Sequence, residues 1–188
     1  MEKNRTRREV CLAAGPAIAA LGVPVSAFGA TAPSQIIPSG AEISHSSAAI
    51  HQEVDFSASP ARLYRALTLT EDFDRVVQLS SAMNTDMKKM LGSAPTKIDP
   101  QPGGAFVLFG GYITGRMLDL VPDTRIVQAW RAGSWEPGAF SIATFAILPR
   151  GAGCRLVFDH TGFPNDAAVE LAKGWHVNYW EPLARALA

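Results

Sequence analysis

Cysteine is scarce in this chain of 188 residues, where only Cys11 and Cys154 are present. Cys11 falls within a segment that we assign below to an export signal, which leaves one thiol in the folded part. One thiol can form neither an internal disulfide nor a cysteine-based metal site. Because Cys154 lies in the apolar run GCRLVF, we expect a buried strand cysteine and no nucleophile.

The chain also has no formal net charge, since its 17 Lys and Arg side chains balance its 17 Asp and Glu side chains. Proteins that bind nucleic acid neutralise its phosphates with a basic surface, and this chain has no basic excess to supply one. We therefore exclude nucleic acid as a partner.

Common catalytic and cofactor motifs are also missing. The sequence has no Gly-x-Ser-x-Gly elbow, which would present a nucleophilic serine. Its glycine-rich run GGYITG joins strand to strand and opens no helix, unlike a phosphate-binding loop. We predict no cofactor and no catalytic residue.

The stretch from Asp159 to Leu183 holds the side chains with the most varied chemistry, among them His160 and His176. A zinc site needs at least three convergent ligands, and this stretch has neither a third histidine nor a His-x-x-x-His spacing. His176 directly follows Trp175 on a predicted helix, so its side chain should point to a different side of the helix from that of Trp175. We therefore expect His176 to be exposed. For His160 three roles stay open: a structural or cavity-lining polar group, an acid–base catalyst, or a metal ligand. We predict the first, and no metal site.

Residues 1–30 have the pattern of an export signal. The basic head MEKNRTRR precedes an uncharged stretch from Val10 to Ala30. Within it, VSA at 25–27 offers the small residues that signal peptidase requires, with AFG at 27–29 as an alternative. The pair Arg7-Arg8 resembles a twin-arginine signal. We predict a periplasmic or otherwise exported protein that meets a membrane only through this signal; the alternatives are an uncleaved anchor and a cytoplasmic protein.

A linker and one domain follow the signal. Residues 31–47 are rich in Ser, Pro and Ala without periodicity, which is typical of a flexible linker. Residues 48–188 are long enough for a single domain with its own core. They begin with an alternating strand pattern at 50–56, after which Ser59-Pro60 supplies the N-cap and first-turn proline of a short helix.

The middle of this domain has the pattern of successive strands separated by short turns. Short connections make neighbouring strands antiparallel, and each strand has one face richer in large apolar side chains. One face of a sheet is therefore expected to be covered. The candidate strands are Ala105–Phe109, Tyr112–Leu120, Arg125–Arg131, Phe140–Leu148 and Cys154–Thr161.

The expected cover is a helix from Pro164 towards Ala188. Its apolar stripe has a four-residue repeat, formed by Leu171, Trp175, Tyr179, Leu183 and Leu187. Pro182 lacks a backbone N–H and clashes with the preceding turn, so we expect a kink near Asn178. The elements together predict an α+β fold with a long helix laid across a sheet, an arrangement that often leaves a cavity.

Several short motifs carry a family resemblance. They are Gly103-Gly104 with Phe106 and Phe109, Thr114-Gly115, Leu120-Val121-Pro122, Ile126-Val127, Trp130-Arg131, Trp135 and Gly138, followed by DHTGFP at 159–164 and GWHVNYWEPL at 174–183. With them the chain resembles the C-terminal domain of the activator of heat-shock protein 90 ATPase, within the START-like (SRPBCC) superfamily. The resemblance covers about residues 49–188. It implies a helix-grip fold, in which a curved antiparallel sheet wraps around a long C-terminal helix.

The resemblance leaves function open, because START-like domains include binders of hydrophobic ligands, polyketide cyclases and co-chaperones. We predict a non-catalytic domain that binds a small apolar ligand between the sheet and the C-terminal helix. The residues expected to contact the ligand are Trp130, Phe145, Phe158, Trp175 and Tyr179, with His160 as a polar contact.

Two alternatives require different features. A co-chaperone of the activator type would act through an outer surface, with the chaperone as its partner in the cytosol. A cyclase-like enzyme requires His160 or Asp159 to face the cavity. The aromatic side chains are also compatible with a plain core, which the sequence does not distinguish from a cavity wall.

Overall fold

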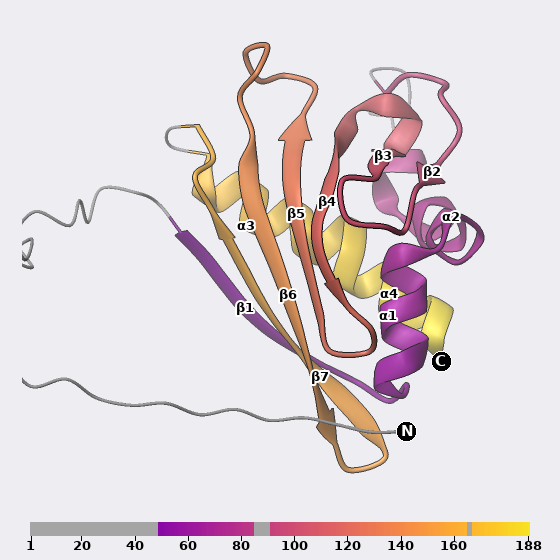
Figure 1. Cartoon of the computed structure of the whole chain (residues 1–188). Helices are drawn as coiled ribbons and strands as arrows, with labels where there is room; N and C mark the ends of the chain where they lie inside the picture. The colour runs from indigo at the N-terminus through magenta and orange to yellow at the C-terminus, as the bar shows by residue number, and fades with distance from the viewer. Residues whose placement is uncertain (1–48, 85–90, 165–166) are drawn as a thin grey trace, which may run out of the picture. The chain divides into compact units, whose positions relative to one another are not determined.

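The computed structural model describes residues 49–84, 91–164 and 167–188 (Figure 1). The predicted export signal at 1–30, the predicted linker at 31–47 and the first residue of the predicted domain lie outside the described residues. Those assignments stay predictions. Within the described ranges, no helix is both long enough and apolar enough to cross a membrane.

A sheet of seven antiparallel strands forms one layer of the described part of the chain, in the order β1-β7-β6-β5-β4-β3-β2. The five candidate strands of the middle are confirmed, with ends that shift by one or two residues. The first strand pairs with the last. The strands are β1 (Ala49–Phe56), β2 (Lys97–Ile98), β3 (Ala105–Leu108), β4 (Ile113–Val121), β5 (Arg125–Ala132), β6 (Ser141–Arg150) and β7 (Gly153–Thr161).

Side chains alternate between the two faces of this sheet, as the period of a strand requires. In β7, Cys154, Leu156, Phe158 and His160 are buried, and the residues between them are exposed or half-buried. The expectation of a buried strand cysteine is therefore confirmed. The opposite face is polar at the pairing of β1 with β7, where Arg155 forms ion pairs with Asp55 and Glu53.

Two helices follow β1. The first, α1 (Pro60–Thr68), begins as the sequence predicts, since the Ser59 side chain accepts a hydrogen bond from the Arg62 N–H. The second, α2 (Thr70–Leu79), leads into a single 3₁₀ turn at Ser81–Asn84. Both helices pack against the end of the C-terminal helix (Figure 1).

The C-terminal helix crosses the concave face of the sheet (Figure 1). It consists of α3 (Ala168–Trp175), a π-helical segment η4 (His176–Trp180) and α4 (Glu181–Leu187). The kink expected from Pro182 takes the form of this π-helical segment. There the Glu181 N–H donates to the carbonyl of His176, five positions earlier, so the helix has already widened where Pro182 offers no donor.

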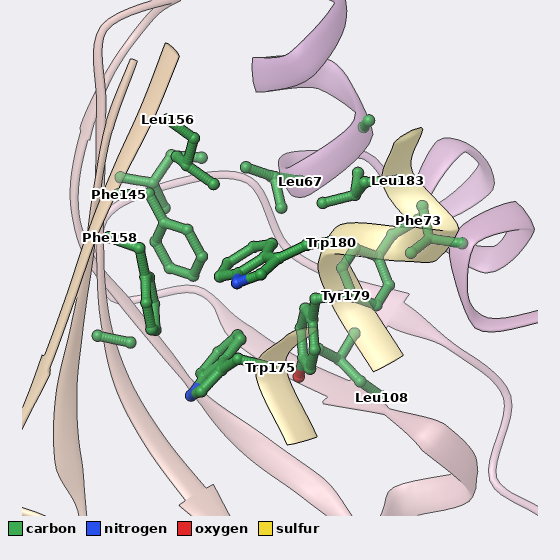
Figure 2. Close-up of a cluster of buried hydrophobic side chains, with 14 of the residues drawn as sticks. Leu67, Phe73, Leu108, Phe145, Leu156, Phe158, Trp175, Tyr179, Trp180 and Leu183 are labelled. Atoms are coloured by element: carbon green, nitrogen blue, oxygen red, sulfur yellow. The ribbon is translucent and has the colours of Figure 1, made fainter. Parts of the chain in front are cut away.

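An aromatic core joins the helix to the sheet. Trp175 and Trp180 stack with an interplanar angle of 17°, because residues five apart share one side of a π-helical turn. Phe158 packs against both rings, as Figure 2 shows. The Trp180 indole also donates to the Gln52 side chain, and that side chain donates to the Ala172 carbonyl. The α+β helix-grip fold predicted from the sequence is confirmed.

Candidate ligand-binding cavity

A cavity of about 380 Å³ lies between β5, the 3₁₀ turn η3 (Phe109–Gly111) and the C-terminal helix. Its rim includes the exposed residues Ser134 and Glu170, so the cavity opens to the surface. Aromatic side chains are prominent among its lining residues: Phe109, Tyr112, Trp130, Trp135, Trp175 and Tyr179. A volume of this size falls within the range of small-molecule sites, about 300–1,000 Å³.

The aromatic walls hold one another in place. Trp175 lies 5.4 Å from Trp130 and 4.2 Å from Tyr179, measured between ring centroids. Trp130 also packs edge-on against Trp135 at 5.3 Å. Tilted and edge-to-face pairs at these distances are the favoured arrangements of aromatic rings, so the wall is a preformed surface.

The six residues that the sequence predicts for a ligand site occupy two layers. Trp130, Trp175 and Tyr179 line the cavity. The remaining three, Phe145, Phe158 and His160, do not; they are fully buried in a layer that contacts the Trp175 ring. These three side chains therefore have no surface on the cavity through which to contact a ligand. In the structure they support the cavity wall by packing against the Trp175 ring.

His160 is the polar centre of this second layer. The Trp175 indole N–H donates to His160 Nδ1 at 3.0 Å, which assigns the ring proton to Nε2. Nε2 lies 2.6 Å from Ser141 Oγ, and the Ser141 hydroxyl donates to the Trp130 carbonyl at 3.0 Å. Burial lowers the pKa of His160 to about 4, so the imidazole is neutral at physiological pH. The chain of hydrogen bonds fixes two walls of the cavity.

The other candidate polar residues lie elsewhere. Asp159 is exposed on the opposite face of β7, where it accepts a hydrogen bond from His51 at 2.7 Å. His176 is exposed, as expected, and lies 3.3 Å from Glu181. The part of the chain that the structure describes contains no group of three His, Cys, Asp or Glu side chains placed to hold a metal ion.

Asn178 and Tyr179 bring polar groups to the cavity, and the sequence singles out only the second. Asn178 Oδ1 accepts hydrogen bonds from Ser80 Oγ at 2.8 Å and from the Ala82 N–H at 3.2 Å. The Tyr179 hydroxyl accepts a weak hydrogen bond from the Trp130 indole at 3.4 Å. Burial raises the pKa of Tyr179, so its hydroxyl keeps its proton.

Two wall positions have backbone features that a plain core would not need. Phe109 has φ of 49°, in the left-handed region that bulky residues rarely adopt, and such strain often marks ligand sites. Gly174 lies inside α3, where glycine costs about 1 kcal/mol relative to alanine. A Cβ atom at Gly174 would meet nothing within 4 Å, so the missing side chain leaves space at the cavity wall.

Residues 57–188 match the sequence model of the family described as Activator of Hsp90 ATPase homolog 1-like protein. The chain belongs to this family. The match takes in every residue that lines the cavity, and β1 precedes it. The resemblance found in the sequence is thus confirmed at the level of the family and its START-like fold.

Members of the activator family from distant organisms are similar to this chain. "Activator of 90 kDa heat shock protein ATPase homolog 1" from Homo sapiens is 28% identical over 126 residues, which is 67% of this chain and 33% of that protein. The homolog from Dictyostelium discoideum is 28% identical over 130 residues, 66% of this chain and 34% of that protein. The chain thus spans about a third of the length of these curated relatives.

Solved structures share the fold of this family member. An HSP90 activator from Plasmodium falciparum superposes with a TM-score of 0.62 at 21% identity and covers 74% of this chain and 95% of its own. CalU16 from Micromonospora echinospora superposes with a TM-score of 0.58 at 20% identity, over 76% of this chain and 77% of its own. At these identities the likeness concerns the fold alone.

Proposed function

We propose that the protein is an exported, non-catalytic START-like domain that binds a small apolar ligand in the cavity between the sheet and the C-terminal helix. The observation that carries the proposal is the cavity of about 380 Å³ with its aromatic lining, which also includes the exposed residues Ser134 and Glu170. When a ligand covers apolar wall surface that faces water, binding is favoured by about 25 cal/mol for each Å² removed from water.

The chemistry of the wall supports binding over catalysis. Of the lining residues that the structure describes, Glu170 is the one with a carboxylate, and it lies exposed at the rim. A cyclase-like enzyme would need His160 or Asp159 at the ligand, yet His160 lies behind Trp175 and Asp159 lies on the opposite face of the sheet. The donors and acceptors of His160 are used to position Trp130 and Trp175 instead.

Filling the cavity from its wall tests the proposal. Gly174→Leu places a side chain into space that no atom within 4 Å of the added Cβ occupies, so the fold should be retained. We expect the affinity for the neutral fluorescent probe N-phenyl-1-naphthylamine to fall by about tenfold or more, since overpacking costs about 1–3 kcal/mol.

The matched control is Ala184→Leu, which adds similar bulk to the exposed side of α4, away from the cavity. This variant should bind the probe as the wild type does. Equal probe affinity in Gly174→Leu, Ala184→Leu and the wild type would place the probe elsewhere and contradict the proposal.

Family membership favours a second candidate, an activator of the ATPase of a 90 kDa heat-shock protein, which relatives carry in their names. This function would use an outer surface, and Phe140, Ile142 and Leu148 supply large exposed apolar side chains on and next to β6. It predicts that the purified domain raises the ATPase rate of such a chaperone. An unchanged rate at saturating domain concentration would remove this candidate.

A further inference from the structure

We propose that the ligand carries a neutral carbonyl oxygen, which accepts hydrogen bonds from the Tyr179 hydroxyl and the Asn178 amide on the helix side of the cavity. This inference rests on the proposed function, because it names the chemical class of the molecule that the cavity takes. Two donors that have no acceptor among the described residues, both on side chains that line the cavity, carry it.

The first donor is the Tyr179 hydroxyl. Tyr179 is 5% exposed and lines the cavity. Its oxygen accepts from the Trp130 indole at 3.4 Å, but among the described residues no group accepts its proton. A buried hydroxyl donor without an acceptor is costly, and an acceptor oxygen on a bound ligand would remove that cost.

The second donor is the Asn178 side-chain NH₂ group. The Ala82 N–H can only donate, so the atom 3.2 Å away from it is the amide oxygen of Asn178. Ser80 and Ser81 hydroxyls, at 2.8 and 3.2 Å, hold the same oxygen. This anchoring fixes the amide plane, and the NH₂ end has no acceptor among the described residues although Asn178 lines the cavity.

Both donors belong to the π-helical segment η4. Such segments are rare and are frequently found at functional sites. The helix therefore departs from regular geometry at the two cavity-lining residues that carry these donors.

The charges around the cavity select a neutral acceptor. Among the described residues that line the cavity there is no Lys or Arg, and the exposed carboxylate of Glu170 lies at the rim. An anionic ligand would lose hydration without gaining a cationic partner, and it would be repelled by Glu170. An apolar ketone, ester or amide satisfies both donors without that penalty.

A matched pair of probes, fluorenone and fluorene, tests the inference, because the two differ by one carbonyl oxygen. Titration is followed by quenching of tryptophan fluorescence, since Trp130, Trp135 and Trp175 line the cavity. We expect the wild type to bind fluorenone about fivefold to hundredfold more tightly than fluorene, the effect of two net hydrogen bonds of about 0.5–1.5 kcal/mol each. In Tyr179→Phe one of the two hydrogen bonds is lost, so this preference should fall by about twofold to tenfold while the affinity for fluorene is kept.

Two further variants guard against indirect effects. Asn178→Asp keeps an oxygen for Ser80, Ser81 and Ala82 but replaces the NH₂ donor with a charged acceptor, so it should also lower the preference for fluorenone. Tyr64→Phe is the control, because it removes a tyrosine hydroxyl from α1, at a half-buried residue that does not line the cavity. This variant should keep the wild-type preference.

The outcomes separate the inference from the proposed function. Equal affinity of the wild type for both probes, or a preference that is unchanged in Tyr179→Phe and in Asn178→Asp, overturns the carbonyl inference while apolar binding stands. Failure of the folded wild type to bind either probe contradicts the proposed function and this inference with it.

Discussion

His160 is the residue on which the geometry of the cavity wall depends most. It accepts from the Trp175 indole and lies within hydrogen-bonding distance of Ser141, whose hydroxyl holds the Trp130 carbonyl. Nδ1 can accept from Trp175 only while the ring is neutral, because a protonated ring has donors on both nitrogens. The wall therefore depends on the protonation state of one buried side chain.

This dependence predicts a loss of stability in acid. The pKa of His160 is about 4 in the folded protein and about 6.5 when unfolded, so the unfolded chain alone binds the proton between these values. Its contribution is fully present above pH 6.5 and is lost as the pH falls towards 4, by up to about 3 kcal/mol. The free energy of unfolding can be measured by urea denaturation from pH 7 to pH 4 for the wild type and for His160→Gln. The loss of stability caused by protonation of His160 should be present in the wild type and absent from His160→Gln.

A variant of the exposed histidine provides the comparison. His176→Gln changes a side chain on the surface beside Glu181, so its profile between pH 7 and pH 4 should follow the wild type. Carboxylates contribute to the slope of every variant in this range, and the difference between variants isolates the histidine. A wild-type slope retained in His160→Gln would place the sensitive group elsewhere.

At the scale of elements, the C-terminal helix has an apolar repeat that the sequence predicts and a π-helical segment that this repeat does not predict. The four-residue repeat of Trp175, Tyr179, Leu183 and Leu187 correctly identifies residues that become buried. The repeat misses Trp180, because its inward position follows from the π-helical turn that accommodates Pro182. Sequence periodicity assumes a regular helix, so it cannot report a change of helical pitch.

The same helix predicts a stabilising substitution. Gly174→Ala adds a methyl group that meets no atom within 4 Å and removes the conformational cost of glycine inside α3. We expect the free energy of unfolding to rise by about 0.5–1 kcal/mol in urea denaturation at pH 7. A decrease would mean that the space beside Gly174 is needed by a neighbouring side chain, which would also undermine the Gly174→Leu experiment.

Polar partners of the site are less predictable than its aromatic wall. Trp130, Trp175 and Tyr179 follow from hydrophobic patterns on single elements, and all three line the cavity. The Asn178 amide is fixed by Ser80 and Ala82, which lie 98 and 96 positions away in the sequence. Such contacts depend on how the helix is placed against the 3₁₀ turn η1 (Ser81–Asn84), and no local signal encodes that placement.

At the scale of the whole molecule, location decides between the two candidate functions. The basic head, the uncharged stretch and VSA at 25–27 predict an exported protein with a cleaved signal. Fractionation of the native cells, with the mature N-terminus read by mass spectrometry, should find a periplasmic chain that begins near Phe28 or Ala30. An uncleaved cytosolic chain would contradict export and favour the chaperone partner.

The pairing of the first strand with the last has a consequence for the order of folding. His51 of β1 and its partner Asp159 of β7 are 108 positions apart, so β1 stays unpaired during synthesis until nearly the whole domain has emerged. An unpaired strand is prone to join other chains, and the exposed charges of Glu53 and Asp55 on β1 oppose that association. Because the family match begins at residue 57, a fragment cut there would lose β1 and expose the edge of β7, the strand that holds His160.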